Sequence, residues 1–302
     1  MMMDGERAHA RGASSPPMVG RPRVDRPRHK RRDGPASGRL RAARLRPQWI
    51  DQPGSRPMSA PMKRAAEPFA IRDVTFRNRI VGTPHNRGFL ADGLPLPEDA
   101  DYWRRRAAGG AAMLTIGGTV TSPESTWRRR MVTEAWRRDA IPGMTQRASA
   151  IRAEGAVAAC QLVHLGRETT GADMWFAPVA PSAVRSPREP TRARMLSEAE
   201  VDGVIDGFVQ SARNAGEAGF QVVELHAAHG YLLAQFLSPS TNQREGADTV
   251  EGRVAVVARI AKGIRAACAE LLIGIRVSTD GETEGGFSLD GLCQLLPTVT
   301  CT

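Results

Sequence analysis

The chain lacks the features that mark a membrane or secreted protein. No run of about 18 apolar residues occurs in it, which argues against a transmembrane helix. The apolar core of a signal peptide is also missing near the first residue. The four cysteines have no paired spacing, since they stand at Cys160, Cys268, Cys293 and Cys301. We therefore expect neither a disulfide framework nor a zinc or iron–sulfur site, and we predict a cytoplasmic protein.

Excess positive charge is missing from most of the chain and is confined to residues 1–65. This segment holds 16 Lys and Arg against 5 Asp and Glu, whereas residues 66–302 hold 26 against 27. It is rich in Arg, Pro, Gly, Ala and Ser, and it has almost no apolar periodicity. Such a segment cannot bury enough surface to offset the entropy of ordering it. We predict a disordered segment over residues 1–65 and a folded domain over residues 66–302.

A basic segment of this kind could bind nucleic acid or anionic lipid without sequence preference. No aromatic interleaving and no nucleic-acid motif accompany the charge, so a solvated tail is the favoured interpretation. Another alternative is translation from an upstream start, with Met58 or Met62 as the working one. We expect neither nucleic acid nor a membrane as a partner, and a homo-oligomer stays an open alternative.

The folded part alternates short apolar runs with amphipathic stretches. Five runs are apolar on both faces and predict buried parallel strands, at residues 80–81, 111–119, 156–166, 220–230 and 271–278. Helices are predicted between and after them, at residues 97–109, 137–155, 196–219, 252–270 and 288–297. Ser197 is the expected N-cap of the clearest helix, with Glu198 and Glu200 in its first turn. Strands separated by helices indicate a parallel sheet covered by helices.

Three polar side chains follow the fourth predicted strand within six residues. His226, His229 and Tyr231 stand where the strand pattern stops, and two imidazoles with a phenol can bind a substrate oxygen and deliver a proton. In a (β/α) barrel this end of a strand carries the catalytic side chains. The histidines alone could instead be metal ligands, but no third ligand stands at a helical or strand spacing. Tyr231 alone would most often be an ordinary half-buried phenol.

The run HAAHGYLLAQFLSP is nearly identical to the active-site motif of the Old Yellow Enzyme family of FMN-dependent oxidoreductases. The chain resembles this family, including its 2,4-dienoyl-CoA reductase-like branch, over roughly residues 67–292. The resemblance implies a (β/α)₈ TIM barrel with FMN at its C-terminal mouth. Because only five strands are predicted, we expect an incomplete barrel, and the iron–sulfur motif of that branch is missing.

The resemblance also assigns residues on the first two strands to the cofactor. In NRIVGTPHNRG, Thr83 and Pro84 would line the flavin edge through their backbone, and His85 would lie near the ring. In LTIGGT, Gly117 or Gly118 would allow a flavin carbonyl to approach the main chain closely.

Residues on the later strands would complete the site. In QLVHLGR and GIRVS, Gln161 matches the side chain that hydrogen-bonds the flavin pyrimidine, and Arg276 matches the cation that stabilises the reduced flavin. His226 and His229 match the pair that holds the oxygen of the substrate, and Tyr231 matches the proton donor.

The implied reaction is hydride transfer from NAD(P)H through FMN to an electron-poor alkene, such as an enone or enoyl thioester. The last two strands, which hold the FMN phosphate in the family, have no counterpart. We therefore expect weak FMN binding and a tendency to aggregate. The alternative is a truncated or frameshifted remnant without enzymatic activity.

Overall fold

The structure is a computed structural model that describes residues 60–125, 132–169, 176–188, 191–279 and 288–300. All of them belong to one compact unit. The predicted disordered segment over residues 1–65 lies outside the described residues except at its end, where Ala60–Ala66 form the short helix α1. Among the described residues, no helix combines the length and the apolar character needed to cross a membrane.

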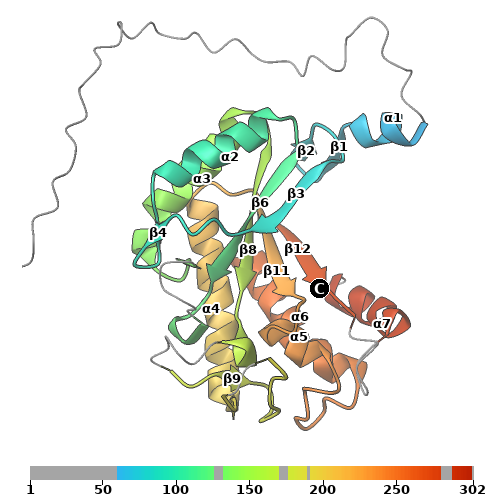
Figure 1. Ribbon diagram of the computed structural model, residues 1–302. Helices are drawn as coiled ribbons and strands as arrows, with labels where there is room; N and C mark the ends of the chain where they lie inside the picture. Colours follow the sequence, from blue (N-terminus) through green and yellow to red (C-terminus); the bar gives the residue numbers. More distant parts are fainter. Residues whose placement is uncertain (1–59, 126–131, 170–175, 189–190, 280–287, 301–302) are drawn as a thin grey trace, which may run out of the picture. The chain divides into compact units, whose positions relative to one another are not determined.

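A curled parallel sheet forms the centre of the unit (Figure 1). Its five main strands lie in the order β12-β11-β8-β6-β3, and the short strand β7 (Thr133–Glu134) pairs with β6. The bounds of these five are β3 (Val81–His85), β6 (Met113–Val120), β8 (Val157–Val163), β11 (Val222–Ala227) and β12 (Leu272–Val277). All five correspond to predicted strands, and each pair in this order is parallel.

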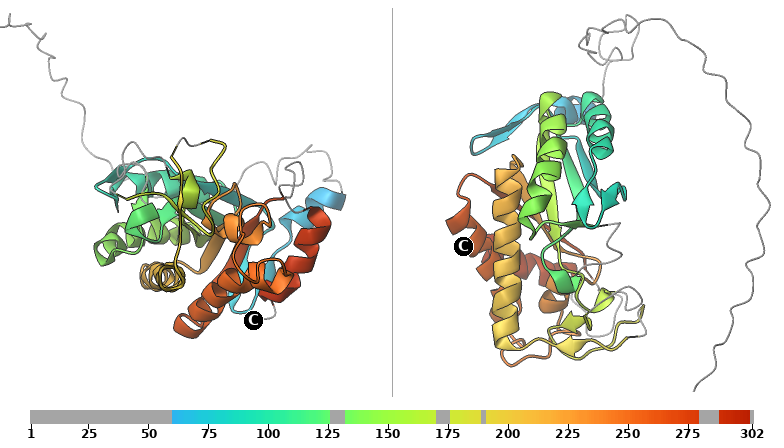
Figure 2. Two further views of the ribbon diagram at one scale, coloured as in Figure 1. Left: turned by 90° about the horizontal axis from the view of Figure 1, so that it is seen from below. Right: turned by 90° about the vertical axis from the view of Figure 1, so that its left-hand side faces the viewer.

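Helices cover the outer face of this sheet (Figures 1 and 2). They share one apolar core with the strands, in which Trp103, Phe208 and Ile260 are among the buried side chains. The helices that contribute to it include α2 (Glu98–Ala108), α3 (Ile141–Ala153), α4 (Glu198–Glu217), α6 (Val250–Ala267) and α7 (Leu289–Thr300). The predicted N-cap of α4 is confirmed, because Ser197 and Glu200 form a reciprocal capping box.

The inner face of the sheet is closed at one end by apolar side chains. The antiparallel hairpin of β1 (Phe69–Ile71) and β2 (Val74–Phe76) packs there against the beginnings of the strands. Phe69 and Phe76 stack with ring centroids 4.7 Å apart. The carboxyl ends of the strands lie at the opposite end of the sheet. The hairpin does not cover this second end, and polar residues lie there.

Smaller elements occupy the connections. The long connection between β8 and α4 contains β9 (Val179–Ala180), which pairs in parallel with β10 (Arg194–Met195). A second hairpin joins β4 (Leu90–Ala91) to β5 (Leu94–Pro95). The short helix α5 (Leu232–Leu237) directly follows the predicted catalytic segment, and the sequence patterns did not predict it. Three single turns of 3₁₀ helix complete the described elements, at Pro123–Ser125, Arg138–Ala140 and Gly166–Glu168.

A buried ion pair fixes α2 against α3. The Nε atom of Arg147 lies 2.7 Å from Oδ2 of Asp99, and both side chains are less than 5% exposed. Trp103 donates its indole N–H to the same carboxylate at 3.0 Å, and Arg147 donates to the Thr133 hydroxyl at 2.8 Å. Burial lowers the pKa of Arg147, and the Asp99 charge opposes that effect. Because the pair is out of water, removing one partner leaves the other charge uncompensated.

We predict that Arg147→Met lowers the free energy of unfolding by about 3–5 kcal/mol, because it leaves the buried Asp99 carboxylate without a cationic partner. The free energy of unfolding should fall less in the double variant Asp99→Leu, Arg147→Met, since neither buried charge is left in it. Urea unfolding followed by circular dichroism measures both changes. A single variant that loses less than about 1 kcal/mol would contradict this account of the pair.

Candidate active site

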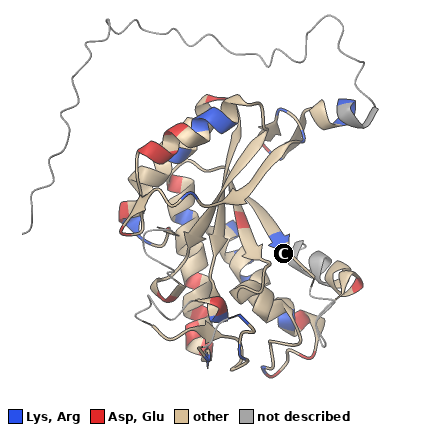
Figure 3. Ribbon diagram, viewed as in Figure 1, with Lys and Arg blue, Asp and Glu red and all other residues tan. Residues whose placement is uncertain are grey.

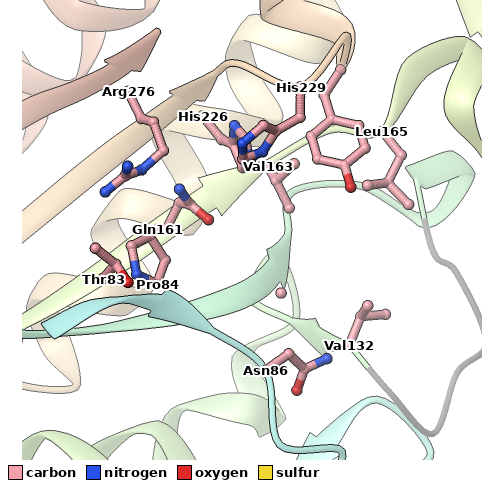
Figure 4. Close-up of a pocket in the computed structure, with 12 residues that line it drawn as sticks. Thr83, Pro84, Asn86, Val132, Gln161, Val163, Leu165, His226, His229 and Arg276 are labelled. Carbon is pink, nitrogen blue, oxygen red and sulfur yellow. Dashed lines mark hydrogen bonds between the residues drawn. The ribbon is translucent and has the colours of Figure 1, made fainter. Parts of the chain in front are cut away.

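A cleft of about 410 Å³ opens at the carboxyl ends of the five strands (Figure 4). This is the size of a site for a small molecule or cofactor. Eight of its lining residues were predicted from the sequence: Thr83, Pro84, Gly118, Gln161, His226, His229, Tyr231 and Arg276. Asn86, Val132, Val163 and Leu165 complete the lining.

The backbone after β11 turns sharply to bring its polar side chains into the cleft. His226 is still within the strand, whereas His229 has a φ of 60° and Gly230 a φ of 74°, both in the left-handed region. A left-handed backbone is unfavourable for histidine because its Cβ approaches the following carbonyl. Two contacts hold this turn, because the His229 N–H donates to Oγ of Ser278 at 3.1 Å and Arg188 donates to the His229 carbonyl at 2.8 Å.

The two imidazoles are joined to each other. The backbone N–H of Ala228 donates to Nδ1 of His226, so a neutral His226 carries its proton on Nε2. That Nε2 lies 3.2 Å from Nδ1 of His229, and the rings meet edge to face with centroids 4.9 Å apart. His226 therefore donates to His229, and Nε2 of His229 is left as a donor without an acceptor among the described residues. In the part of the chain that the structure describes, no group of three or more His, Cys, Asp or Glu could hold a metal ion.

The environment keeps His226 and Tyr231 uncharged. Burial, the neighbouring His229 and then Arg276 lower the pKa of His226 to about 3. The phenol of Tyr231 lies against the His226 ring with centroids 4.9 Å apart. Burial raises its pKa, and Glu168 and Arg188 act on it in opposite directions. At neutral pH the site thus presents a neutral imidazole and a protonated phenol.

The side of the cleft formed by β8 and β12 is polar. Gln161 is 4% exposed, and the guanidinium of Arg276 extends toward the same space (Figure 4). The Gln161 amide donates to Oε1 of Glu224 at 2.7 Å, and Nε of Arg276 donates to the same oxygen at 2.9 Å. Val132, Val163 and Leu165 form an apolar cluster that packs against Tyr231 and supplies the other wall.

Two of the predicted cofactor residues are not among those that line the cleft. The ring of His85 contacts α2, where Nε2 lies 2.7 Å from the Tyr102 hydroxyl and the ring centroid lies 4.7 Å from that of Trp103. A Cβ on Gly117 would come within 3.0 Å of the His85 backbone nitrogen, so this glycine permits close packing of β3 against β6. The structure thus places the His85 ring against α2, and its expected proximity to the flavin ring stays a prediction.

Irregular strand pairing accounts for the positions of His85 and Gly117 outside the lining of the cleft. The register between β3 and β6 shifts between Gly82 and His85, and the register between β6 and β8 shifts between Ile116 and Thr119. A bulge of this kind changes the face to which the following side chains point. No pattern in the sequence located these shifts, although the Gly117-Gly118 pair is typical of such a position.

Some residues at the cleft that the sequence analysis did not name could have been found from the two-residue period of the strands. Val163 follows Gln161 by two positions, and Glu224 precedes His226 by two, so each pair shares a face of its strand. Leu165 continues the same alternation beyond β8. Asn86 had no comparable signal, because it follows the register shift in β3.

Comparisons with known proteins agree with the fold. A model of the NADH:flavin oxidoreductase / NADH oxidase family matches residues 66–291. The 4,4'-dithiodibutanoate disulfide reductase of Rhodococcus erythropolis is 34% identical over 197 residues, which cover 65% of this chain and 48% of that protein. NADPH dehydrogenase of Halalkalibacterium halodurans (strain ATCC BAA-125 / DSM 18197 / FERM 7344 / JCM 9153 / C-125) is 32% identical over 231 residues. The match covers 75% of this chain and 67% of that protein.

The solved structure of the old yellow enzyme homologue from Zymomonas mobilis has a TM-score of 0.70 and 26% identity, covering 78% of this chain and 68% of that one. The predicted resemblance and the predicted class, an incomplete (β/α)₈ barrel, are confirmed. The chain spans from about a third to two thirds of the length of the curated relatives that it matches.

We predict that His226 makes the protein less stable as the pH falls. Its pKa is about 3 in the folded state and 6.5 in the reference state, so between these values only the unfolded chain binds the proton. The free energy of unfolding should therefore fall by up to about 1.4 kcal/mol per pH unit from pH 6.5 toward pH 3, through this group alone.

Urea unfolding of the wild type and of His226→Gln over this pH range measures the effect as a difference. The difference removes the contribution of the carboxylates, which titrate in both proteins. Parallel curves for the two proteins would show that His226 is protonated equally in the folded and unfolded states, contrary to this account.

Proposed function

The chain belongs to the NADH:flavin oxidoreductase / NADH oxidase family, whose cofactor is FMN and whose reductant is NADH or NADPH, and we propose that its cleft binds FMN and reduces an activated alkene. The substrate would be a small molecule with an electron-poor double bond, such as an enone or enoyl thioester. The observation that carries this proposal is the meeting of His226, His229 and Tyr231 with Gln161 and Arg276 in one cleft.

The residues of the cleft fit the flavin ring of FMN. Gln161 offers an amide and Arg276 a cation on one side, which suits the polar pyrimidine edge of the ring. Gly118 has a φ of 67°, and a Cβ there would meet the Asn86 side chain at 2.7 Å, so a side chain at this position would displace Asn86 from the lining of the cleft. The Arg276 guanidinium would offset the negative charge of the reduced ring. FMN, when bound, accepts a hydride from NAD(P)H and returns it to the substrate.

The imidazole pair would bind the oxygen atom of the substrate. Negative charge grows on this oxygen when the double bond accepts a hydride at its β-carbon, so donors aimed at it accelerate the reaction. Nε2 of His229 is the donor without an acceptor in the described residues, and His226 fixes the tautomer that makes it a donor. His226 could donate directly if its contact with His229 opens on binding.

Tyr231 would supply the proton that completes the reduction. A protonated phenol is required for this step, and burial keeps the pKa of Tyr231 raised. Its ring lies 4.9 Å from that of His226 and 6.2 Å from that of His229, centroid to centroid, so the proton donor stands beside the oxygen site. Solvent would then return a proton to the phenolate.

We predict that Tyr231→Phe slows reduction of 2-cyclohexen-1-one by about 10²–10⁴-fold, because it removes the proton donor. Reduction of bound FMN by NADPH, which needs no phenol, should change little. Stopped-flow absorbance separates these two half-reactions.

The matched control is Tyr102→Phe, which changes the other of the two tyrosines and removes only the contact with His85. It should leave both half-reactions unchanged. Equal enone reduction by the wild type and Tyr231→Phe would overturn the role of Tyr231. Failure of the wild type to reduce any enone would favour the alternative of a remnant without activity.

A further inference from the structure

The five main strands, all of which lie among the described residues, carry only two charged side chains. These are Glu224 on β11 and Arg276 on β12. Figure 3 shows most of the other charges on helices, connections and short strands. Charged residues are rarely placed in the interior of a protein unless they are paired. On the five main strands, Glu224 and Arg276 are therefore the two residues whose charges must be accounted for by pairing.

The register of the parallel strands brings Glu224 and Arg276 close together. His226 is opposite Arg276, and Glu224 is opposite both Gly274 on β12 and Gln161 on β8. Gly274 has no side chain, so the guanidinium can reach back over it to the carboxylate. Nε of Arg276 then lies 2.9 Å from Oε1 of Glu224, with the side chains 34% and 15% exposed.

The same carboxylate oxygen also holds Gln161. Nε2 of Gln161 donates to Oε1 of Glu224 at 2.7 Å, which fixes the orientation of the amide. The amide therefore presents its carbonyl oxygen to the cleft and keeps its N–H₂ against the acid. Glu224 does not line the cleft itself, so it stands behind the two residues that do.

We propose that Glu224 is a positioning residue that sets how Gln161 and Arg276 meet the flavin ring. This inference rests on the proposed function. Glu224 makes the Gln161 carbonyl the group offered to the cofactor, which suits an N–H of the pyrimidine edge. It also aims the guanidinium and offsets part of its charge, and in this way limits how strongly the site favours reduced over oxidised FMN.

A purely structural role would have a different consequence. If Glu224 only tied β8, β11 and β12 together, its loss would weaken the fold without changing the preference between the two flavin states. If it tunes Arg276, removing its charge leaves a stronger positive field beside the ring, which favours the anionic reduced form. The reduction potential separates these roles, because a structural role would not move it.

The test compares the wild type with Glu224→Gln, which has the same shape without the charge. FMN is titrated into each protein, and the reduction potential of the bound FMN is measured by equilibration with a redox dye. We expect the ratio of the affinities for reduced and oxidised FMN to rise at least about tenfold in Glu224→Gln, a positive shift of about 30 mV for a two-electron couple.

The matched control is Glu217→Gln, which removes an acid that pairs with Arg138 on the surface. Its potential should equal that of the wild type. A second readout needs no flavin, because exchange of the Arg276 Nε–H with solvent, followed by ¹⁵N NMR, should become at least about tenfold faster in Glu224→Gln when its acceptor is weakened.

The outcomes distinguish this inference from the proposed function. If the wild type binds FMN and Glu224→Gln has the same potential, the positioning role is wrong and the proposed function stands. If the wild type does not bind FMN, both are wrong. If Glu224→Gln is misfolded by circular dichroism, Glu224→Asp replaces it. The carboxylate of Glu224→Asp is withdrawn by one methylene, and a potential equal to that of the wild type would then overturn the role.

Discussion

Parallel hydrogen bonding between β8, β11 and β12 is the constraint on which the cleft depends. The register of these strands is fixed by their backbones, and it sets Gln161 opposite Glu224 and His226 opposite Arg276. Residues two apart on one strand share a face, so Glu224 and His226 both point inward. A shift of one residue in any of these pairings would turn the polar set toward the helices and bury it in the apolar core. The chemistry of the site therefore follows from the pairing of its strands.

The strands and helices of the sheet could be predicted because each has a strong local pattern. The five strands are short apolar runs, and α4 combines an apolar stripe with the Ser197 cap. The helix α5 could not be predicted, because LLAQFL is short and apolar and its six residues fit a buried strand equally well. The hairpin of β1 and β2 has a similar difficulty, since three residues in each strand are too few to show a period.

The sequence indicated which strand ends carry the polar residues of the cleft, but it did not indicate how each side chain is oriented there. Gln161 and Arg276 are in regular register with β11 and line the cleft, although Gln161 faces a register shift on its β6 side. His85 follows a register shift in β3, and its ring turns to Tyr102 and Trp103. The left-handed backbone of His229 depends on Ser278 and Arg188, both distant in sequence. Contacts between distant residues decide such details, and no local pattern contains them.

Titration of FMN with the purified chain, followed by quenching of flavin fluorescence, tests the central claim most directly. The account predicts saturable binding at one site, weakened at least about tenfold in Arg276→Met. It also predicts unchanged binding in Arg259→Met, which removes a surface arginine paired with Asp202. Absence of binding, or equal binding by the wild type and Arg276→Met, would contradict the assignment of this cleft to the flavin.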